Sequence, residues 1–195
     1  MEERKVVMSE LAVLVVDDSP FARTMLVRAL VDIGFSEAQI FQAQNGEEVL
    51  QAIQEREFSL VILDIVMTGI DGVSVLREIK KNHPQSKVIM CSSSNSEEII
   101  KESVLLGSDA FIVKPYQNET LKRVVNRIMN LNAKETNAES LVAKCHVCSQ
   151  KMIEVNSSDL VSFYCPQNCM KLGPWSNVLV NQAELDEEYE KARKI

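Results

Sequence analysis

Five polar side chains stand at the ends of short apolar runs in the N-terminal part of the chain. They are Asp17, Asp18, Asp64, Ser92 and Lys114. If these runs are parallel strands, their carboxyl ends lie at one edge of a sheet and the five side chains converge there. Carboxylates in contact repel one another by about 4 kcal/mol per pair at an effective dielectric near 20. A hard divalent cation such as Mg²⁺ would relieve that repulsion, because Mg²⁺ prefers carboxylate oxygens together with water and phosphate.

The same groups are suited to phosphoryl chemistry. A carboxylate can attack phosphorus and form an aspartyl phosphate. The transfer needs positioning and charge stabilisation, which a metal ion, the Lys114 ammonium and the Ser92 hydroxyl could supply. The alternative is structural, since an aspartate after a strand is often a helix N-cap and Lys114-Pro115 could simply end a strand. The joint occurrence of all five groups at strand ends favours the chemical interpretation.

Four of the five cysteines form a second group near the C-terminus. Cys145 and Cys148 are separated by two residues, and Cys165 and Cys169 by three. Paired cysteines at this spacing predict a structural zinc site with four thiolate ligands and no position for a catalytic water. About 40 residues cannot bury enough apolar surface to fold alone, so the metal would supply the missing stability. Free or disulfide-bonded cysteines, or rubredoxin-like iron, are the alternatives.

The composition is that of a globular protein with an acidic balance. Apolar residues make up 46% of the 195 residues and charged residues 25%, and the net charge is −7. The acidic charge argues against a general polyanion binder, whose affinity would come from a basic surface. No apolar run is long enough to suggest a signal peptide or a membrane span. The sequence therefore predicts a cytoplasmic protein without membrane attachment.

The elements that must position the first group alternate regularly between residues 11 and 132. Five apolar runs predict strands at 11–16, 40–43, 60–63, 87–91 and 110–113. Between and after them, apolar residues recur at helical spacing, ending with the stripe Leu121, Val124, Val125 and Ile128. Right-handed crossovers then give an α/β fold, a doubly wound five-stranded parallel sheet covered by helices on both faces.

These motifs resemble, in order and spacing, the receiver domain of two-component response regulators. The matching segments are Val15-Val16-Asp17-Asp18-Ser19, Leu63-Asp64-Ile65-Val66-Met67, Asp71-Gly72, Met90-Cys91-Ser92-Ser93 and Lys114-Pro115-Tyr116. The resemblance covers residues 11–131 and implies a flavodoxin-like receiver fold. It implies that Asp64 accepts a phosphoryl group from a histidine kinase or a phosphotransfer protein. Asp17 and Asp18 would bind Mg²⁺ together with Asp64 and the backbone carbonyl of Val66.

The resemblance also assigns roles to three further residues. Lys114 would pair with the phosphoryl group, Ser92 would be the switch hydroxyl that moves toward it, and Phe111 would be the aromatic side chain that turns inward in response. Neither Val66 nor Ser94 is an acid or amide that could orient water, so phosphoryl loss is expected to be slow. The chain departs from the family in having Met67-Thr68 where members usually have Met-Pro.

The C-terminal part predicts a separate small module. We expect a receiver at 1–131, a linker at 132–140 and, at 141–195, a zinc-ribbon-like β domain with a charged terminal helix. Within that module, residues 152–155 and 160–164 flank a turn and predict a β-hairpin. No basic footprint for DNA is present in this region.

Three functions remain open from the sequence. The first is a phosphorylation-switched signalling protein that binds an unidentified downstream protein through the receiver face or the zinc module. The second is a DNA-binding transcriptional regulator that uses the ribbon. The third, a metal-dependent phosphatase, is disfavoured because the position two residues after Asp64 is Val66 rather than an acid. The face that carries the last two receiver helices is a candidate surface for a phosphorylation-dependent homodimer, by resemblance only.

Overall fold

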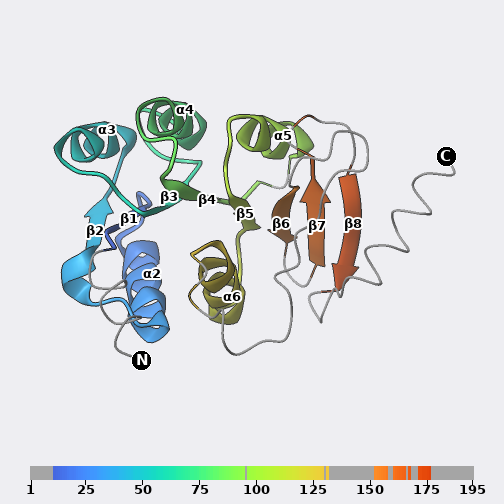
Figure 1. Ribbon diagram of the computed structural model, residues 1–195, viewed down its shortest axis with the longest axis horizontal. Helices are drawn as coiled ribbons and strands as arrows, with labels where there is room; N and C mark the ends of the chain where they lie inside the picture. The colour runs from blue at the N-terminus through green and yellow to red at the C-terminus, as the bar shows by residue number, and fades with distance from the viewer. Residues whose placement is uncertain are drawn as a thin grey trace, which may run out of the picture.

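A parallel sheet forms the centre of the predicted receiver region, as the computed structural model shows (Figure 1). The structure describes residues 11–94, 96–129, 131, 152–157, 160–165, 167 and 171–176. The five predicted strands are β1 (Val13–Val16), β2 (Ile40–Ala43), β3 (Leu60–Asp64), β4 (Lys87–Ser92) and β5 (Ala110–Val113). They pair in the order β2-β1-β3-β4-β5, and all of these pairs are parallel. The predicted five-stranded parallel sheet is confirmed.

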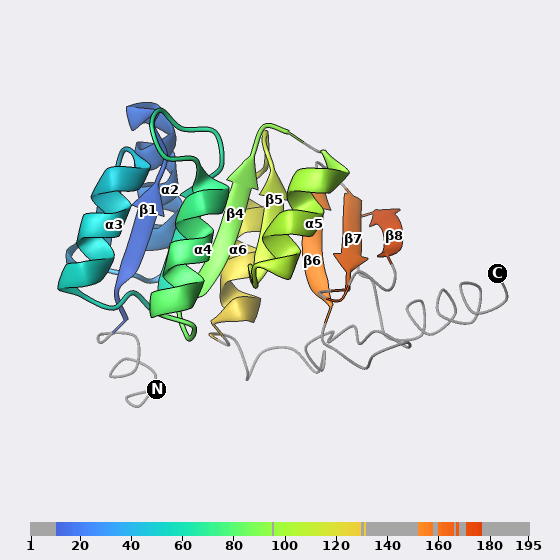
Figure 2. The same cartoon turned by 90° about the horizontal axis from the view of Figure 1, so that it is seen from above.

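Helices cover both faces of this sheet (Figures 1 and 2). The structure has α2 (Pro20–Ile33), α3 (Gly46–Glu55), α4 (Gly72–Asn82), α5 (Glu97–Leu105) and α6 (Asn118–Ile128), with a short 3₁₀ helix at Glu37–Gln39 before β2. One face carries α2 and α6, and the other carries α3, α4 and α5. None of the helices in the described part of the chain is long and apolar enough to cross a membrane.

The sequence explains why the helices begin and end where they do. Ser19 caps α2 by accepting a hydrogen bond from the Ala22 amide, and Pro20 begins the helix, where its missing N–H costs nothing. Gly34 ends α2 with φ of 119°, a backbone conformation that favours glycine. On α6 the apolar stripe faces the sheet, since Leu121, Val124 and Val125 are buried.

The core is divided by the sheet into two apolar layers. Every residue of β1 and β3 is buried, as expected of strands covered on both faces. Alternate residues of each strand point to opposite faces, so that Leu63 packs toward the layer under α3–α5 and Ile62 toward the layer under α2 and α6. This double cover fixes the strands whose carboxyl ends carry the polar groups.

Three further strands extend the sheet beyond β5. They are β6 (Ile153–Ser157), β7 (Leu160–Tyr164) and β8 (Lys171–Ser176). β6 pairs in parallel with β5, whereas β7 and β8 add antiparallel, which gives one eight-stranded sheet. The predicted hairpin at 152–164 is confirmed, but it continues the receiver sheet, a pairing that the sequence did not predict.

Several predicted features lie outside the described residues. These are Cys145, Cys148, Cys169, the linker at 132–140 and the charged helix at 183–194. The boundaries proposed for the receiver, the linker and the C-terminal module therefore stay predictions.

Candidate functional site

Three carboxylates meet at the carboxyl edge of the central strands. Asp17 directly follows β1, and Asp64 is the last residue of β3, which neighbours β1 in the sheet. Carboxylate oxygens of Asp17, Asp18 and Asp64 all lie within 4.8 Å of one another. Asp17 and Asp64 are only 2% and 5% exposed, whereas Asp18 is open to solvent. The convergence predicted from strand order is confirmed.

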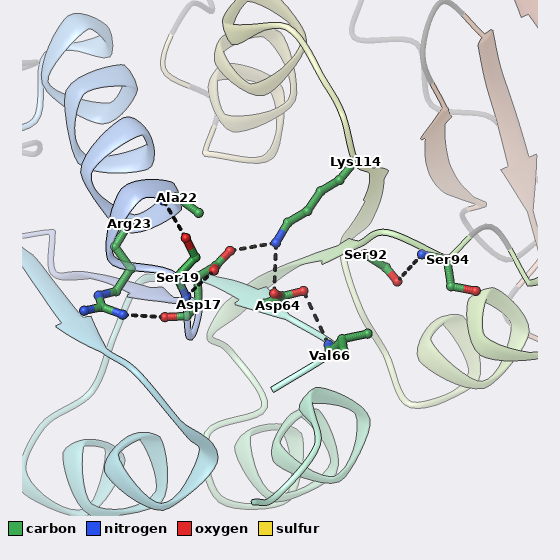
Figure 3. A network of polar contacts seen from close by, with 9 residues as sticks. All are labelled: Asp17, Ser19, Ala22, Arg23, Asp64, Val66, Ser92, Ser94 and Lys114. Carbon is green, nitrogen blue, oxygen red and sulfur yellow. Dashed lines mark hydrogen bonds and ion pairs between the residues drawn. The ribbon is translucent and has the colours of Figure 1, made fainter. Parts of the chain in front are cut away.

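Lys114 joins the two buried carboxylates. Its Nζ donates to Asp17 Oδ2 at 2.6 Å and to Asp64 Oδ2 at 2.9 Å, as Figure 3 shows. The residue directly follows β5, and its backbone N–H donates to the Ser92 carbonyl at 2.7 Å. The lysine therefore offsets part of the carboxylate repulsion in this structure, a contribution that the sequence reasoning assigned only to a metal ion.

Burial and pairing shift the pKa values of this cluster. Burial raises the pKa of Asp64 above its usual value, and the contacts with Lys114 only partly oppose that shift. Burial by itself would lower the pKa of Lys114, but its hydrogen bonds to Asp17 and Asp64 leave that pKa raised. Lys114 is thus a permanent cation at neutral pH, placed where further negative charge would be stabilised.

A local network holds the chain that follows β1. Asp17 Oδ1 accepts a hydrogen bond from the Ser19 amide at 2.9 Å, and the Asp17 carbonyl accepts one from Arg23 of α2 at 2.7 Å. The N-cap of α2 is Ser19, not either aspartate, so the structural alternative considered for Asp17 and Asp18 is wrong. The Arg23 contact was missed because an arginine in the first turns of a helix ordinarily points into solvent.

The other predicted site residues lie on the neighbouring strands or just after them. Ser92 ends β4, is fully buried, and its Oγ accepts a hydrogen bond from the Ser94 amide at 3.0 Å. The Val66 amide lies 3.4 Å from Asp64 Oδ1, while its side chain is 60% exposed. Phe111 is fully buried in the middle of β5, so it already points inward in this structure.

Gly72 packs directly against the backbone of Asp64. Asp71 caps α4, and the following Gly72 N–H donates to the Ile65 carbonyl at 3.0 Å. A Cβ atom at position 72 would lie 2.1 Å from the Asp64 carbonyl oxygen, far inside van der Waals contact. The Asp71-Gly72 motif is visible in the sequence, but the close approach that requires glycine is visible only in the structure.

The donor set fits Mg²⁺. The ion takes oxygen ligands, keeps several waters, and is usually bound by one or two carboxylates and phosphate oxygens. Asp17, Asp18 and Asp64 supply clustered carboxylate oxygens, and the exposure of Asp18 leaves room for water on one side. Among the described residues only carboxylates belong to this cluster, which disfavours zinc at this edge.

Removing the lysine should destabilise the protein in a way that Mg²⁺ reverses. In Lys114→Met the two buried carboxylates lose the cation at 2.6 and 2.9 Å. We expect the free energy of unfolding to fall by about 2 kcal/mol without Mg²⁺, a value discounted for the partial exposure of Lys114. Saturating Mg²⁺ should restore most of it, because a bound ion neutralises the same charges.

Urea unfolding with and without Mg²⁺ measures this effect. The matched control is Lys87→Met, which removes the lysine paired with Asp109 at 3.0 Å and should change stability equally with and without the ion. A loss in Lys114→Met that Mg²⁺ leaves unchanged would contradict the expectation that lysine and metal neutralise the same carboxylates.

Comparison with known proteins identifies the family. The model of the response regulator receiver domain matches residues 13–126. Chemotaxis protein CheY of Bacillus subtilis is 34% identical over 118 residues, which are 60% of this chain and 97% of that protein.

Two solved structures are similar in fold and in sequence. Response regulator protein TrrA from Thermotoga maritima in complex with Mg²⁺-BeF has a TM-score of 0.54 and 35% identity, over 60% of this chain and 98% of that one. The CheX-CheY-BeF3-Mg²⁺ complex from Borrelia burgdorferi contains a chain with a TM-score of 0.56 and 31% identity, over 61% of this chain and 89% of that one. Together with the acidic cluster at the expected strand ends, these matches place the chain in the family of response regulators that carry a receiver domain.

Proposed function

We propose that the chain is a phosphorylation-switched signalling protein in which Asp64 accepts a phosphoryl group from a histidine kinase or a phosphotransfer protein. The observation that carries this proposal is the contact of one buried lysine with two buried carboxylates, beside a third that is open to solvent. Lys114 already lies where a phosphoryl group on Asp64 would add negative charge. Its cation would therefore stabilise the acyl phosphate.

The roles of the individual groups follow from their positions. The Asp64 carboxylate attacks phosphorus, the bond from phosphorus to the donor breaks, and the donor leaves with its bonding electrons. Lys114 exchanges part of its contact with Asp64 for the phosphoryl oxygens. Asp17, Asp18, Asp64 and the Val66 carbonyl would hold Mg²⁺, which neutralises charge on the phosphoryl oxygens when bound.

Two further residues would respond to the phosphoryl group. Ser92 would give up its hydrogen bond from the Ser94 amide and donate its hydroxyl proton to a phosphoryl oxygen. Phe111 would shift its side chain on β5 in response to the phosphoryl group. Since the group ends on the protein and is lost only slowly, the chain acts as a phosphoryl acceptor and not as an enzyme with multiple turnovers.

The proposal is tested with the full chain, a small phosphodonor such as acetyl phosphate, and Mg²⁺. Intact-mass spectrometry should show one added phosphoryl group, and chelation of Mg²⁺ should prevent it. Peptide mapping should place the group on Asp64. An unmodified mass at saturating donor and Mg²⁺ would overturn the proposal.

The output is proposed to be protein binding. The complex from Borrelia burgdorferi shows that a similar receiver chain binds another protein, CheX, in the presence of BeF3 and Mg²⁺. The acidic net charge of −7 disfavours the alternative of a DNA-binding regulator. A gel shift that weakens steeply with salt would support that alternative. A phosphorylation-dependent homodimer and a cytoplasmic location stay predictions.

A zinc site at the four cysteines is a second proposal, favoured by one local contact. Cys165 is buried, and its Sγ accepts a hydrogen bond from the Gln167 amide at 3.3 Å. An amide donor two residues after a cysteine stabilises the thiolate form that binds zinc. The remaining three cysteines lie outside the described residues.

We expect one zinc ion per chain in protein purified without chelators. Cys165→Ser should lose most of it, because three thiolates bind zinc far more weakly than four. Cys91→Ala is the matched control, since Cys91 lies inside the receiver core and should leave the zinc content unchanged. Metal analysis by mass spectrometry decides between zinc, iron and a metal-free protein, and a metal content independent of Cys165 would exclude this site.

A further inference from the structure

β6 is attached to the receiver by a partly buried charge cluster. Glu154, on β6, is 4% exposed and accepts a hydrogen bond from Arg123 of α6 at 2.9 Å. Its second carboxylate oxygen forms an ion pair with Arg127, one turn further along the same helix. Arg123 also donates to Asn156 Oδ1 at 2.5 Å. We call Arg123, Arg127, Glu154 and Asn156 the α6–β6 clasp.

The opposite face of β6 is apolar. Val155 is in register with Phe111 of β5, and both belong to the apolar layer under α5. Tyr164 of β7 is buried in the same layer. The strand therefore covers the edge of β5 with an apolar face toward α5 and a charged face toward α6 (Figure 2).

The receiver fold does not depend on this cover in related proteins. The matched part of the Bacillus subtilis relative is 97% of that protein, although it corresponds to only 60% of this chain. Five strands and their helices thus make a complete receiver, and β6 to β8 are added at its edge.

The clasp is built for specificity more than for strength. Burying Glu154 together with most of Arg127 costs desolvation that offsets much of their attraction, so this pair favours one geometry more than it adds stability. The buried Asn156 Nδ2 finds no hydrogen-bond partner among the described residues, a further cost of the docked arrangement. Both costs lower the stability of the docked arrangement and so make the contact easier to open.

The strand that β6 covers is directly followed by the lysine of the proposed phosphorylation site. Val113 pairs with Ser157 at the end of the β5–β6 ladder, and the next residue is Lys114. In this structure β6 is paired with β5 while Lys114 contacts both Asp17 and Asp64. A phosphoryl group adds charge at Asp64 and would draw Lys114 toward it, pulling on the end of β5 at which the ladder terminates.

We propose that β6 to β8 form a removable cover of the β5 edge, held by the α6–β6 clasp, and that phosphorylation of Asp64 loosens it. The linkage, which is the effect of phosphorylation on the cover, rests on the proposed function. The proposal that the α6–β6 clasp holds the cover does not. By reciprocity, loosening the cover favours phosphorylation to the same extent that phosphorylation loosens the cover.

Hydrogen exchange of the full chain, read by mass spectrometry, tests both parts. After acetyl phosphate and Mg²⁺, the amides of β6 should exchange at least about tenfold faster, while those of β1 and β3 keep their rates. Asp64→Asn treated in the same way should show no change. Glu154→Gln should speed exchange in β6 by a similar factor without any phosphodonor. Glu102→Gln, which removes the exposed partner of Arg77, is the matched control and should leave β6 unchanged.

The outcomes separate the two proposals. An unmodified intact mass defeats the proposed function and the linkage with it, while Glu154→Gln still tests the clasp. A confirmed phosphoryl adduct with unchanged or slower exchange in β6 overturns the linkage alone. If Glu154→Gln leaves β6 protected, or speeds exchange equally in β1, the cover is not a removable element held by this clasp.

Discussion

Asp64→Asn is expected to accept no phosphoryl group from acetyl phosphate and Mg²⁺. The substitution keeps the size of the side chain, but an amide oxygen is not a nucleophile toward phosphorus under these conditions. Asp64 is 5% exposed and is held by Lys114, so no other carboxylate of the described residues can take its position without moving the strands. We expect adduct formation to fall to less than about 1% of the wild-type level, as is usual when the reacting group itself is removed.

The matched control is Asp71→Asn. Asp71 is exposed, caps α4 through the Val73 and Ser74 amides, and lies outside the carboxylate cluster. Asparagine is an equally good N-cap, so stability and phosphoryl acceptance should both be retained. Intact-mass spectrometry of both variants and the wild type, with circular dichroism to confirm folding, gives the comparison. Wild-type levels of adduct in Asp64→Asn would show that another residue is the acceptor.

The site could be predicted from the sequence because each of its residues stands at the end of a strand that the sequence itself predicts. Once the five apolar runs are parallel strands, the positions of Asp17, Asp64 and Lys114 at one edge follow from chain direction alone. The burial that raises the pKa of Asp64 also follows from the sheet, because Asp64 is the last residue of β3, a strand that is covered on both faces. The prediction needed no information about side-chain contacts.

The contacts between distant segments could not be predicted in this way. Arg123 and Arg127 stand on the polar side of the α6 stripe, where charged residues ordinarily contact water. Glu154 reads as the exposed position of an alternating strand, yet it is buried against those arginines. Only the pairing of β6 with β5 brings the three together, and nothing in either strand specifies its neighbour in the sheet.

The cysteine pattern gave no indication of where the hairpin packs, for a related reason. Ligand spacing suggests a module stabilised by its own metal, so the hairpin was expected to pack within that module. In the structure Val155 and Tyr164 pack into the receiver core. The receiver thus supplies the apolar contacts that a segment of this length lacks, and a metal at the cysteines would add to that support.

Gly72→Ala is expected to lower the free energy of unfolding by about 3 kcal/mol, the upper part of the range for overpacking a core. The new methyl group would lie 2.1 Å from the Asp64 carbonyl oxygen and 2.7 Å from Ile65 Cα. Both are backbone atoms at the end of β3, so neither can move without shifting the strand that carries Asp64. Phosphoryl acceptance should therefore fall together with stability.

Gly107→Ala separates this steric effect from the conformational role of glycine. Gly107 has φ of 93°, but a Cβ atom there would make only ordinary van der Waals contacts, the nearest with Lys80 Cδ at 3.8 Å. Its substitution should cost only about 1 kcal/mol of backbone strain and leave phosphoryl acceptance unchanged. Urea unfolding and the phosphorylation assay on both variants test the difference. Equal losses of stability, or full phosphoryl acceptance in Gly72→Ala, would show that contact with Gly72 does not hold Asp64 in its reactive position.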